Sequence, residues 1–281
     1  MKLSTCVARS QLVGLLLVGL LAGCASIPEG VTVQRDIAYG EAAEQRFDLY
    51  YRPPLHNAPI LFAVHGGAWW LGDKANSDFV INKVSHWVPR GGIVISANYR
   101  MLPEAEPMQQ AQDVAQAIAA VKRRALEWGG DPAALVLMGH SSGAHLLTLV
   151  ATRPELAEQA GPVLGLVSLD SGGYDIAEIM RNEPIWIYRH AFARKPELWE
   201  ALSPINFVSE RMPPVLAVCS GVWPIPCDQS RRFVELARER GVRAELLPVA
   251  MNHKQVNDLL GVDPDYTAVV DRFLQSLHPG F

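Results

Sequence analysis

Short apolar runs alternate with helical patterns along most of this chain, and the alternation predicts its fold class. The clearest helix is predicted from Gln109 to Trp128, where Val114, Ile118, Val121 and Ala125 form one apolar stripe at helical spacing. The short apolar runs predict eight strands. These strands are expected at Val31–Ala38, Arg46–Arg52, Ile60–His65, Ile93–Asn98, Leu135–Met138, Val163–Leu169, Val215–Cys219 and Ala244–Val249.

Strands that are apolar throughout and alternate with helices are typical of a parallel sheet that is covered on both faces. We therefore expect an α/β fold with a mostly parallel eight-stranded sheet. The first two strands have no helix between them, so they are expected to form an antiparallel edge. The longest interruption, residues 174–211, is rich in bulky side chains. It is interpreted as a small cap over the site, or alternatively as a peripheral helix pair that packs its own aromatic residues.

The first residues of the chain have the layout of a secretory signal. Lys2 and Arg9 provide positive charge, and Leu12–Leu21 is an apolar stretch too short to span a bilayer. The following Leu21-Ala22-Gly23-Cys24 ends in small residues and resembles the lipobox of bacterial lipoproteins. An ordinary secretory signal is the alternative.

The resemblance to a lipobox implies three segments. Residues 1–23 are expected to be removed, 24–30 to be a tether with lipid on Cys24, and 31–281 to be the folded domain. Ala25, rather than aspartate, follows the cysteine. In lipoproteins of this kind, that favours an outer-membrane location in the bacterial cell envelope, facing the periplasm or the exterior.

Net charge and cysteine content indicate which partners and which cellular compartment to expect. A formal net charge of −4 gives no indication of nucleic acid as a partner. Cys219 and Cys227 are the two cysteines that remain after Cys6 is removed and Cys24 is lipidated, and an exported protein can join them in a disulfide. Closing this short loop would stabilise the fold by about 2.5 kcal/mol on chain-entropy grounds. Two reduced cysteines are the alternative.

The pentapeptide Gly139-His140-Ser141-Ser142-Gly143 has the Gly-x-Ser-x-Gly form of a nucleophile elbow. An apolar, strand-like run precedes it and a helical pattern follows it. In such a strand–turn–helix unit the serine points into open space above the sheet. The context therefore makes Ser141 the candidate nucleophile.

A second glycine motif, His65-Gly66-Gly67-Ala68-Trp69, follows the third predicted strand. It is the His-Gly-Gly signature that accompanies nucleophile elbows and supplies backbone N–H groups to a developing oxyanion. The predicted oxyanion hole consists of the N–H of Ser142 with those of Gly66 or Gly67 and Ala68. His65 itself is expected to be structural, and an ordinary glycine turn is the alternative for the whole motif.

A serine hydroxyl needs a base within hydrogen-bond reach. His253 is the histidine that comes both after the last predicted strand and late enough for the Ser–acid–His order of this kind of site. His278 lies in the tail beyond the final helix. His140 and His145 are attached to the backbone of the elbow itself, so we expect His253 to be the base.

The sequence offers several candidates for the acid that orients His253. Asp170 ends the sixth predicted strand, from which an aspartate can orient the histidine. Asp228 lies near the usual position after the seventh strand, and it also looks like the N-cap of a helix that begins at Gln229. A Cys219–Cys227 bridge would pull Asp228 back toward the strand end. Asp170 is preferred, Asp228 is the alternative, and Asp175 is a third candidate.

Several motifs together resemble the α/β-hydrolase carboxylesterases related to hormone-sensitive lipase and to the bacterial feruloyl-esterase and acetylesterase groups. Besides the two glycine motifs, the matching pieces are Phe47–Tyr50, Asn98–Glu104, Gly129–Pro132 and Leu202–Pro204. The resemblance covers most of the expected mature chain. The chain departs from it where the usual acid after the seventh strand is missing.

This resemblance implies an α/β-hydrolase fold and hydrolysis of a short to medium acyl ester without a cofactor. The expected partners are a small-molecule ester and, through the anchor, a membrane; oligomeric state is left open. No cluster of histidine, cysteine and acidic residues shows metal-ligand spacing. A non-catalytic binding protein and an amidase or peptidase on the same fold are the competing interpretations.

Overall fold

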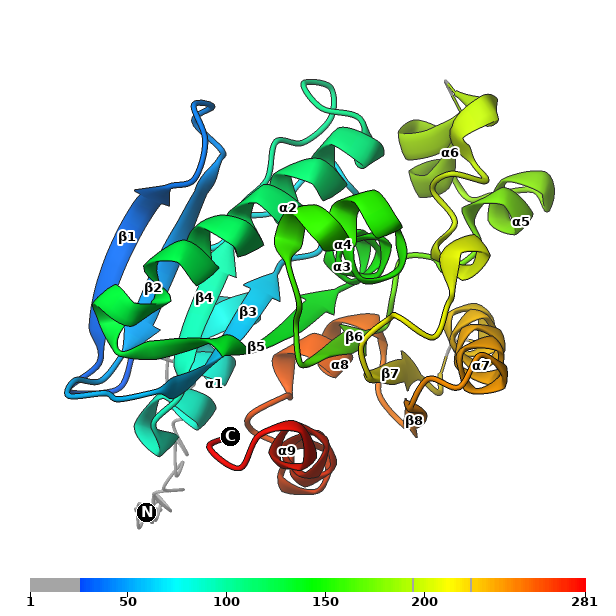
Figure 1. The fold of residues 1–281 in the computed structure, drawn as a ribbon. Helices are drawn as coiled ribbons and strands as arrows, with labels where there is room; N and C mark the ends of the chain where they lie inside the picture. Colours follow the sequence, from blue (N-terminus) through cyan, green and yellow to red (C-terminus); the bar gives the residue numbers. More distant parts are fainter. Residues whose placement is uncertain (1–25, 194, 223) are drawn as a thin grey trace, which may run out of the picture.

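The computed structural model describes residues 26–193, 195–222 and 224–281, in which eight strands form one sheet (Figure 1). The predicted signal segment and Cys24 lie outside these residues. The sheet order is β1-β2-β4-β3-β5-β6-β7-β8. The strands are β1 Thr32–Ala38, β2 Arg46–Tyr51, β3 Ala58–Val64, β4 Ile93–Ala97, β5 Gly130–His140, β6 Gly165–Leu169, β7 Val215–Ser220 and β8 Ala244–Val249.

Strands β3 to β8 run parallel, whereas β1 pairs antiparallel with β2, and β2 pairs antiparallel with β4. The predicted sheet and its antiparallel edge are therefore confirmed. Thr32 pairs with Tyr51, and the neighbouring Tyr50 pairs with Val94 near the start of β4. The chain thus enters the domain at the amino ends of the parallel strands.

Helices cover both faces of the sheet (Figure 1). Those on one face are α2 Pro107–Arg124, α3 Ser142–Thr152, α4 Pro154–Ala160 and α7 Pro224–Glu239, and those on the other are α1 Ser77–Trp87, α8 His253–Asp258 and α9 Pro264–Leu277. Alternate residues of β3 divide between these two layers. Ile60, Phe62 and Val64 pack in the first core cluster, and Leu61 and Ala63 pack in the second.

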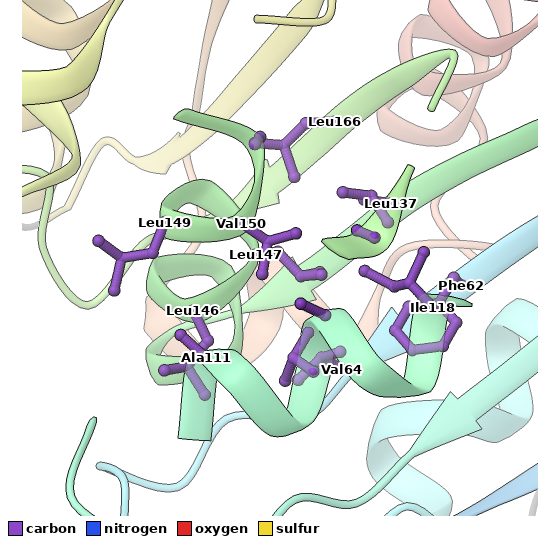
Figure 2. Close-up of a cluster of buried hydrophobic side chains, with 14 of the residues drawn as sticks. Phe62, Val64, Ala111, Ile118, Leu137, Leu146, Leu147, Leu149, Val150 and Leu166 are labelled. Carbon is purple, nitrogen blue, oxygen red and sulfur yellow. The ribbon is translucent and has the colours of Figure 1, made fainter. Parts of the chain in front are cut away.

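The first core cluster fills the space between the sheet and helices α2 and α3 (Figure 2). Ile118 of α2 and Leu147 of α3 lie against Phe62 and Leu137 of the central strands. All four side chains are completely buried. Truncating Phe62 to alanine would cost about 3–5 kcal/mol because the surrounding structure cannot fully collapse into the cavity. This packing makes the central strands a rigid base for the loops at their carboxyl ends.

Two predicted boundaries need correction. Helix α2 ends at Arg124, and Ala125–Trp128 forms a 3₁₀ turn before Gly129 adopts a left-handed conformation with φ 77°. The predicted strand Leu135–Met138 is too short, because β5 extends from Gly130 to His140. Its early part pairs through Gly130 with Ala58 across an irregularity in the register.

The segment between β6 and β7 carries α5 Ile176–Arg181, α6 Trp186–Phe192 and two 3₁₀ turns, Pro196–Leu198 and Pro204–Phe207. Helices α5 and α6 project beyond the carboxyl end of the sheet (Figure 1). Phe192 packs edge-to-face on Trp69 with ring centroids 4.7 Å apart, and Trp186 contacts Trp70 at 5.9 Å. Aromatic residues of this segment therefore pack on the loop after β3 and not only on one another. Across the described parts of the chain, no helix has the length and apolarity to cross a membrane.

Candidate active site

The turn between β5 and α3 holds Ser141 in a strained backbone conformation, with φ 54° and ψ −121°. Glycine is required on both sides of it. A Cβ on Gly139 would lie 2.7 Å from the Gly143 carbonyl carbon, and one on Gly143 would lie 2.3 Å from the His65 carbonyl oxygen. The Ser141 N–H donates to the Leu169 carbonyl at 3.0 Å, which helps to hold the strained residue in place.

His253 reaches this serine from the other end of the chain. It is the first residue of α8, and its Nε2 lies 3.0 Å from Oγ of Ser141, although the two residues are 112 positions apart. Its Nδ1 lies 2.6 Å from Oδ2 of Asp170. A proton on Nδ1, facing the carboxylate, leaves Nε2 free to accept from the serine hydroxyl.

Asp170 directly follows β6 and is completely buried. Its second oxygen, Oδ1, accepts from the Ser220 N–H at 2.8 Å, and its own N–H donates to the Val218 carbonyl at 2.8 Å. The end of β7 therefore fixes the carboxylate through both backbone and side chain. A buried carboxylate is stable only when it is paired or hydrogen-bonded, and here His253 and Ser220 meet that need.

The other two candidate acids lie elsewhere. Asp228 is exposed and pairs with Arg231 at 2.9 Å, one turn along the same helix. It does not cap a helix that begins at Gln229, because α7 already begins at Pro224. The Cys219–Cys227 disulfide is present, with a Cα–Cα distance of 5.1 Å. Asp175 is the N-cap of α5, where its Oδ1 accepts from the Glu178 N–H.

The loop from Gly66 to Ala68 passes beside the serine. A Cβ on Gly66 would lie 2.9 Å from Cβ of Ser141, so a side chain there would occupy the space around the hydroxyl. The loop turns sharply, with φ 137° at Gly67 and 55° at Ala68. The Ser142 N–H belongs to the first turn of α3, where N–H groups have no carbonyl within the helix to bind. The Gly66–Ala68 loop and the N-terminus of α3 therefore lie beside Ser141.

Buried polar residues hold the Gly66–Ala68 loop in place. Oδ1 of Asn98 lies 3.1 Å from His65 Nε2 and also accepts from the Lys74 N–H at 2.5 Å. Burial lowers the pKa of His65, which supports the structural role predicted for it. Burial also lowers the pKa of Lys74, but hydrogen bonds to Asp36 and Asp48 outweigh this effect and raise the pKa overall. The motif residues Asp48 and Asn98, to which the sequence assigned no role, therefore brace the loop after β3.

Two further histidines, His140 and His145, lie beside the serine; His145 is buried and His140 is half-buried. His140 Nε2 lies 2.9 Å from the His253 carbonyl oxygen, and burial, followed by the nearby His253, lowers the pKa of His140 to about 3. The Trp69 indole N–H donates to His145 Nδ1 at 3.1 Å, and burial lowers the pKa of His145 to about 4. Both rings are therefore neutral near pH 7. In the sequence, only their closeness to Ser141 suggested a role for these two histidines.

Ser141 and His253 line a cavity of about 1140 Å³ between the Gly66–Gly72 loop and the α5–α6 segment. Leu71, Ile185 and Trp186 also line it, and each is more than half exposed. Large apolar side chains that remain exposed in a concave site are typical of ligand-binding surfaces. In the portion of the chain that the structure covers, no group of three or more histidine, cysteine or acidic residues is placed to hold a metal ion.

Comparison with known proteins agrees with this architecture. The BD-FAE family matches residues 47–171. Esterase LipQ of Mycobacterium tuberculosis is 32% identical over 224 residues, which are 73% of this chain and 53% of LipQ. The isoprenylcysteine alpha-carbonyl methylesterase ICME of Arabidopsis thaliana is 29% identical over 255 residues, covering 83% of this chain and 58% of ICME. This chain is a relative of the α/β-hydrolase esterases. It spans little more than half the length of these two relatives.

Solved structures confirm the α/β-hydrolase fold. A truncated carbohydrate esterase from gut microbiota superimposes with a TM-score of 0.73 at 21% identity, covering 88% of this chain and 96% of that one. Esterase Est2 of Thermogutta terrifontis gives a TM-score of 0.71 at 22% identity, covering 89% and 93%. At such identities the likeness establishes the fold and leaves the activity to be argued from the site.

Proposed function

We propose that this α/β-hydrolase is a serine carboxylesterase that works through an acyl-enzyme intermediate. The observation that carries the proposal is the continuous hydrogen-bonded series from buried Asp170 through His253 to Ser141, which ends in an open cavity. Nucleophile, base and orienting acid come from the ends of β5, β8 and β6, and only the fold brings them together. The esterase relatives support the same class of reaction.

In the proposed reaction, Oγ of Ser141 attacks the ester carbonyl carbon while His253 Nε2 takes the hydroxyl proton. Asp170 stabilises the resulting imidazolium. The oxyanion accepts hydrogen bonds from the N–H of Ser142 and from the Gly66–Ala68 loop, and losing one such donor typically costs about 3 kcal/mol. His253 then protonates the departing alcohol, and a water molecule activated by the same histidine releases the acyl group as a carboxylic acid.

The cavity supports an ester with a short to medium acyl chain and a larger alcohol group. Its volume of about 1140 Å³ is slightly above the range of sites for drug-sized ligands. A short acyl group alone would leave most of this space empty, whereas an apolar alcohol could cover the exposed side chains of Leu71 and Trp186. Each methylene buried there would contribute about 0.8 kcal/mol.

Two ester series measured on the mature protein would test this proposal. In a p-nitrophenyl series, kcat/KM should rise from acetate to a medium chain length and then fall, and a rate that keeps rising beyond about twelve carbons would refute the acyl assignment. In a series of butyrate esters, kcat/KM should rise from methyl to naphthyl alcohols. That preference should weaken in Trp186→Ala but not in Leu126→Ala, which removes an exposed apolar side chain outside the cavity lining.

Lipidation of Cys24 and an outer-membrane location are also part of the proposal. The lipobox-like sequence supports them, and the register of β1 adds a consequence. Because the chain enters the domain at the amino ends of the strands and Ser141 follows the carboxyl end of β5, an anchor would hold the catalytic cavity away from the membrane. We therefore expect the substrate to arrive from the aqueous side.

A further inference from the structure

The helix that carries His253 is too short to define the position of the imidazole by itself. Helix α8 has six residues and follows the edge strand β8. Isolated helices of this length are unstable in water. A capping box between Asn252 and Gln255 closes its first turn, but these contacts lie within the segment itself. The 3.0 Å distance from His253 to Ser141 must therefore be maintained by groups on other elements.

Side chains from several other elements bind this segment, among them Tyr266 and Asn82, which donate to the Val256 and Asp258 carbonyls. Three others are spread along its length. The Ser220 hydroxyl at the end of β7 donates to the Met251 carbonyl at 2.7 Å, just before the helix. His140 Nε2 lies 2.9 Å from the carbonyl oxygen of His253 itself. Lys83 of α1 donates to Asn257 Oδ1 at 2.7 Å and to the Asn257 carbonyl at 3.3 Å, in the last turn. The helix is thus bound before its start, at its first residue and near its end.

His140 is well suited to fix the histidine that it contacts. Its ring is 4.6 Å from the His253 ring, at an interplanar angle of 37°. A neutral imidazole that faces a carbonyl through Nε2 carries its proton there and donates it. On its other side, Nδ1 would be 3.1 Å from a Cβ placed on Gly66, so the same ring lies between the oxyanion loop and α8.

Lys83 has no evident role in the chemistry, yet it is completely buried. Besides the two acceptors on Asn257, its ammonium donates to the Phe79 carbonyl of its own helix at 2.7 Å. Burial lowers the pKa of Lys83 to about 7, and the charge of Asp258, the next residue of α8, partly offsets this effect. Burying a lysine is costly unless its donors are satisfied, and two of its three acceptors belong to Asn257.

We propose that His140 and Lys83 are positioning residues, which hold α8 at its first and last turns so that His253 stays aligned with Ser141 and Asp170. The proposal rests on the esterase function proposed above. Neither residue touches the reacting atoms. Loss of either should therefore lower kcat, because the alignment of the base is lost. KM should stay nearly unchanged when Lys83 is replaced, because Lys83 lies outside the cavity lining, to which His140 belongs.

Hydrogen exchange of the intact protein gives a readout that does not depend on catalysis. We expect amide exchange in residues 253–260 to accelerate at least tenfold in His140→Ala and in Lys83→Met. Lys122→Met is the matched control, because Lys122 is on α2 across the sheet and its ammonium binds the Pro162 carbonyl. Unchanged exchange in both positioning variants would overturn the proposal, even if the protein hydrolysed no ester.

Kinetics on the same variants then test alignment. A displacement of about 1 Å can cost on the order of 100-fold in rate, so kcat should fall about 10-fold to 100-fold in His140→Ala and in Lys83→Met, with KM within about threefold in Lys83→Met. His140→Gln retains an N–H donor and should recover most of the rate. A glutamine variant as slow as the alanine variant would refute the role of the hydrogen bond.

Thermal melting identifies any variant that fails to fold. If Lys83→Met unfolds, comparison of the two His140 variants still decides the question.

Discussion

Replacing Asp170 with asparagine should nearly abolish turnover, and the reason lies in the two hydrogen bonds of the carboxylate. Oδ1 accepts from the Ser220 N–H at 2.8 Å, and Oδ2 faces His253 Nδ1 at 2.6 Å. The asparagine side chain has one oxygen instead of two. The Ser220 N–H is held in place by the end of β7 and needs a hydrogen-bond acceptor. The amide oxygen should therefore turn to Ser220, which leaves the NH₂ group facing His253.

An NH₂ group at that position changes the histidine tautomer. Nδ1 must then accept a hydrogen bond, so the ring proton moves to Nε2, where it points at the Ser141 hydroxyl. In that form His253 cannot take the serine proton. The corresponding substitution in the serine-protease triad, a worked case in general enzymology, lowers kcat roughly 10⁴-fold. A loss of that size corresponds to about 5.4 kcal/mol of transition-state stabilisation.

Asp228→Asn is the matched control, because it makes the same chemical change at the competing acid. Asp228 is exposed, and its carboxylate contacts Arg231 on its own helix. Losing a surface ion pair of this kind costs less than about 1 kcal/mol. Turnover should therefore stay within about threefold of the unmodified protein.

The assay is steady-state hydrolysis of p-nitrophenyl butyrate between pH 6 and 9, with circular dichroism to confirm that each variant is folded. A folded Asp170→Asn protein that retains more than a tenth of the original kcat would refute the tautomer argument. If Asp228→Asn proved the slower variant, the acid assignment would be reversed.

Three other predictions concern the nucleophile, the lipid anchor and the pH dependence of stability. Ser141→Ala should abolish both ester hydrolysis and labelling by a fluorophosphonate probe while leaving the melting temperature close to the original; undiminished labelling would place the nucleophile elsewhere. Cys24→Ser should prevent incorporation of radiolabelled palmitate in cells, whereas release of both forms as soluble protein would contradict the lipobox interpretation. Stability should fall as the pH drops from about 6.5 toward about 4, because the folded protein holds the pKa values of half-buried His140 and buried His145 below that of a free histidine, and unfolding lets both take up protons. Each contributes a slope of about 1.4 kcal/mol per pH unit, so urea midpoints at pH 7, 6 and 5 should decrease, and His145→Gln should make the decrease less steep.

The local parts of the site could be predicted from the sequence because short-range sterics determine them. Gly139 and Gly143 are needed wherever a strand turns into a helix this tightly, so the pentapeptide predicts the position of Ser141. The eight apolar runs predict the sheet, since its central strands β3, β4, β6 and β7 are buried at every position. The strand and helix ends were less accurate, as the 3₁₀ turn after α2 shows, because terminal hydrogen bonds depend on packing.

The acid of the triad could not be chosen from the sequence alone. Asp170 and Asp228 each follow a strand of the same sheet, and both positions were compatible with a triad. What separates them is the backbone donor of Ser220, which holds the Asp170 carboxylate against His253 while Asp228 faces solvent. His140 and Lys83 went unrecognised for a similar reason, because each binds a part of α8 more than 100 residues away.

The sequence by itself determined the α/β fold, the elbow and the identity of the nucleophile and base candidates, because these follow from periodicity and from the steric demands of single turns. The tertiary structure alone decided which carboxylate faces the histidine, what holds α8 in place and how large the cavity is. Those properties depend on distances between chain segments that are far apart in the sequence. Such distances are set by the packing of the whole sheet and its helices, which no local pattern encodes.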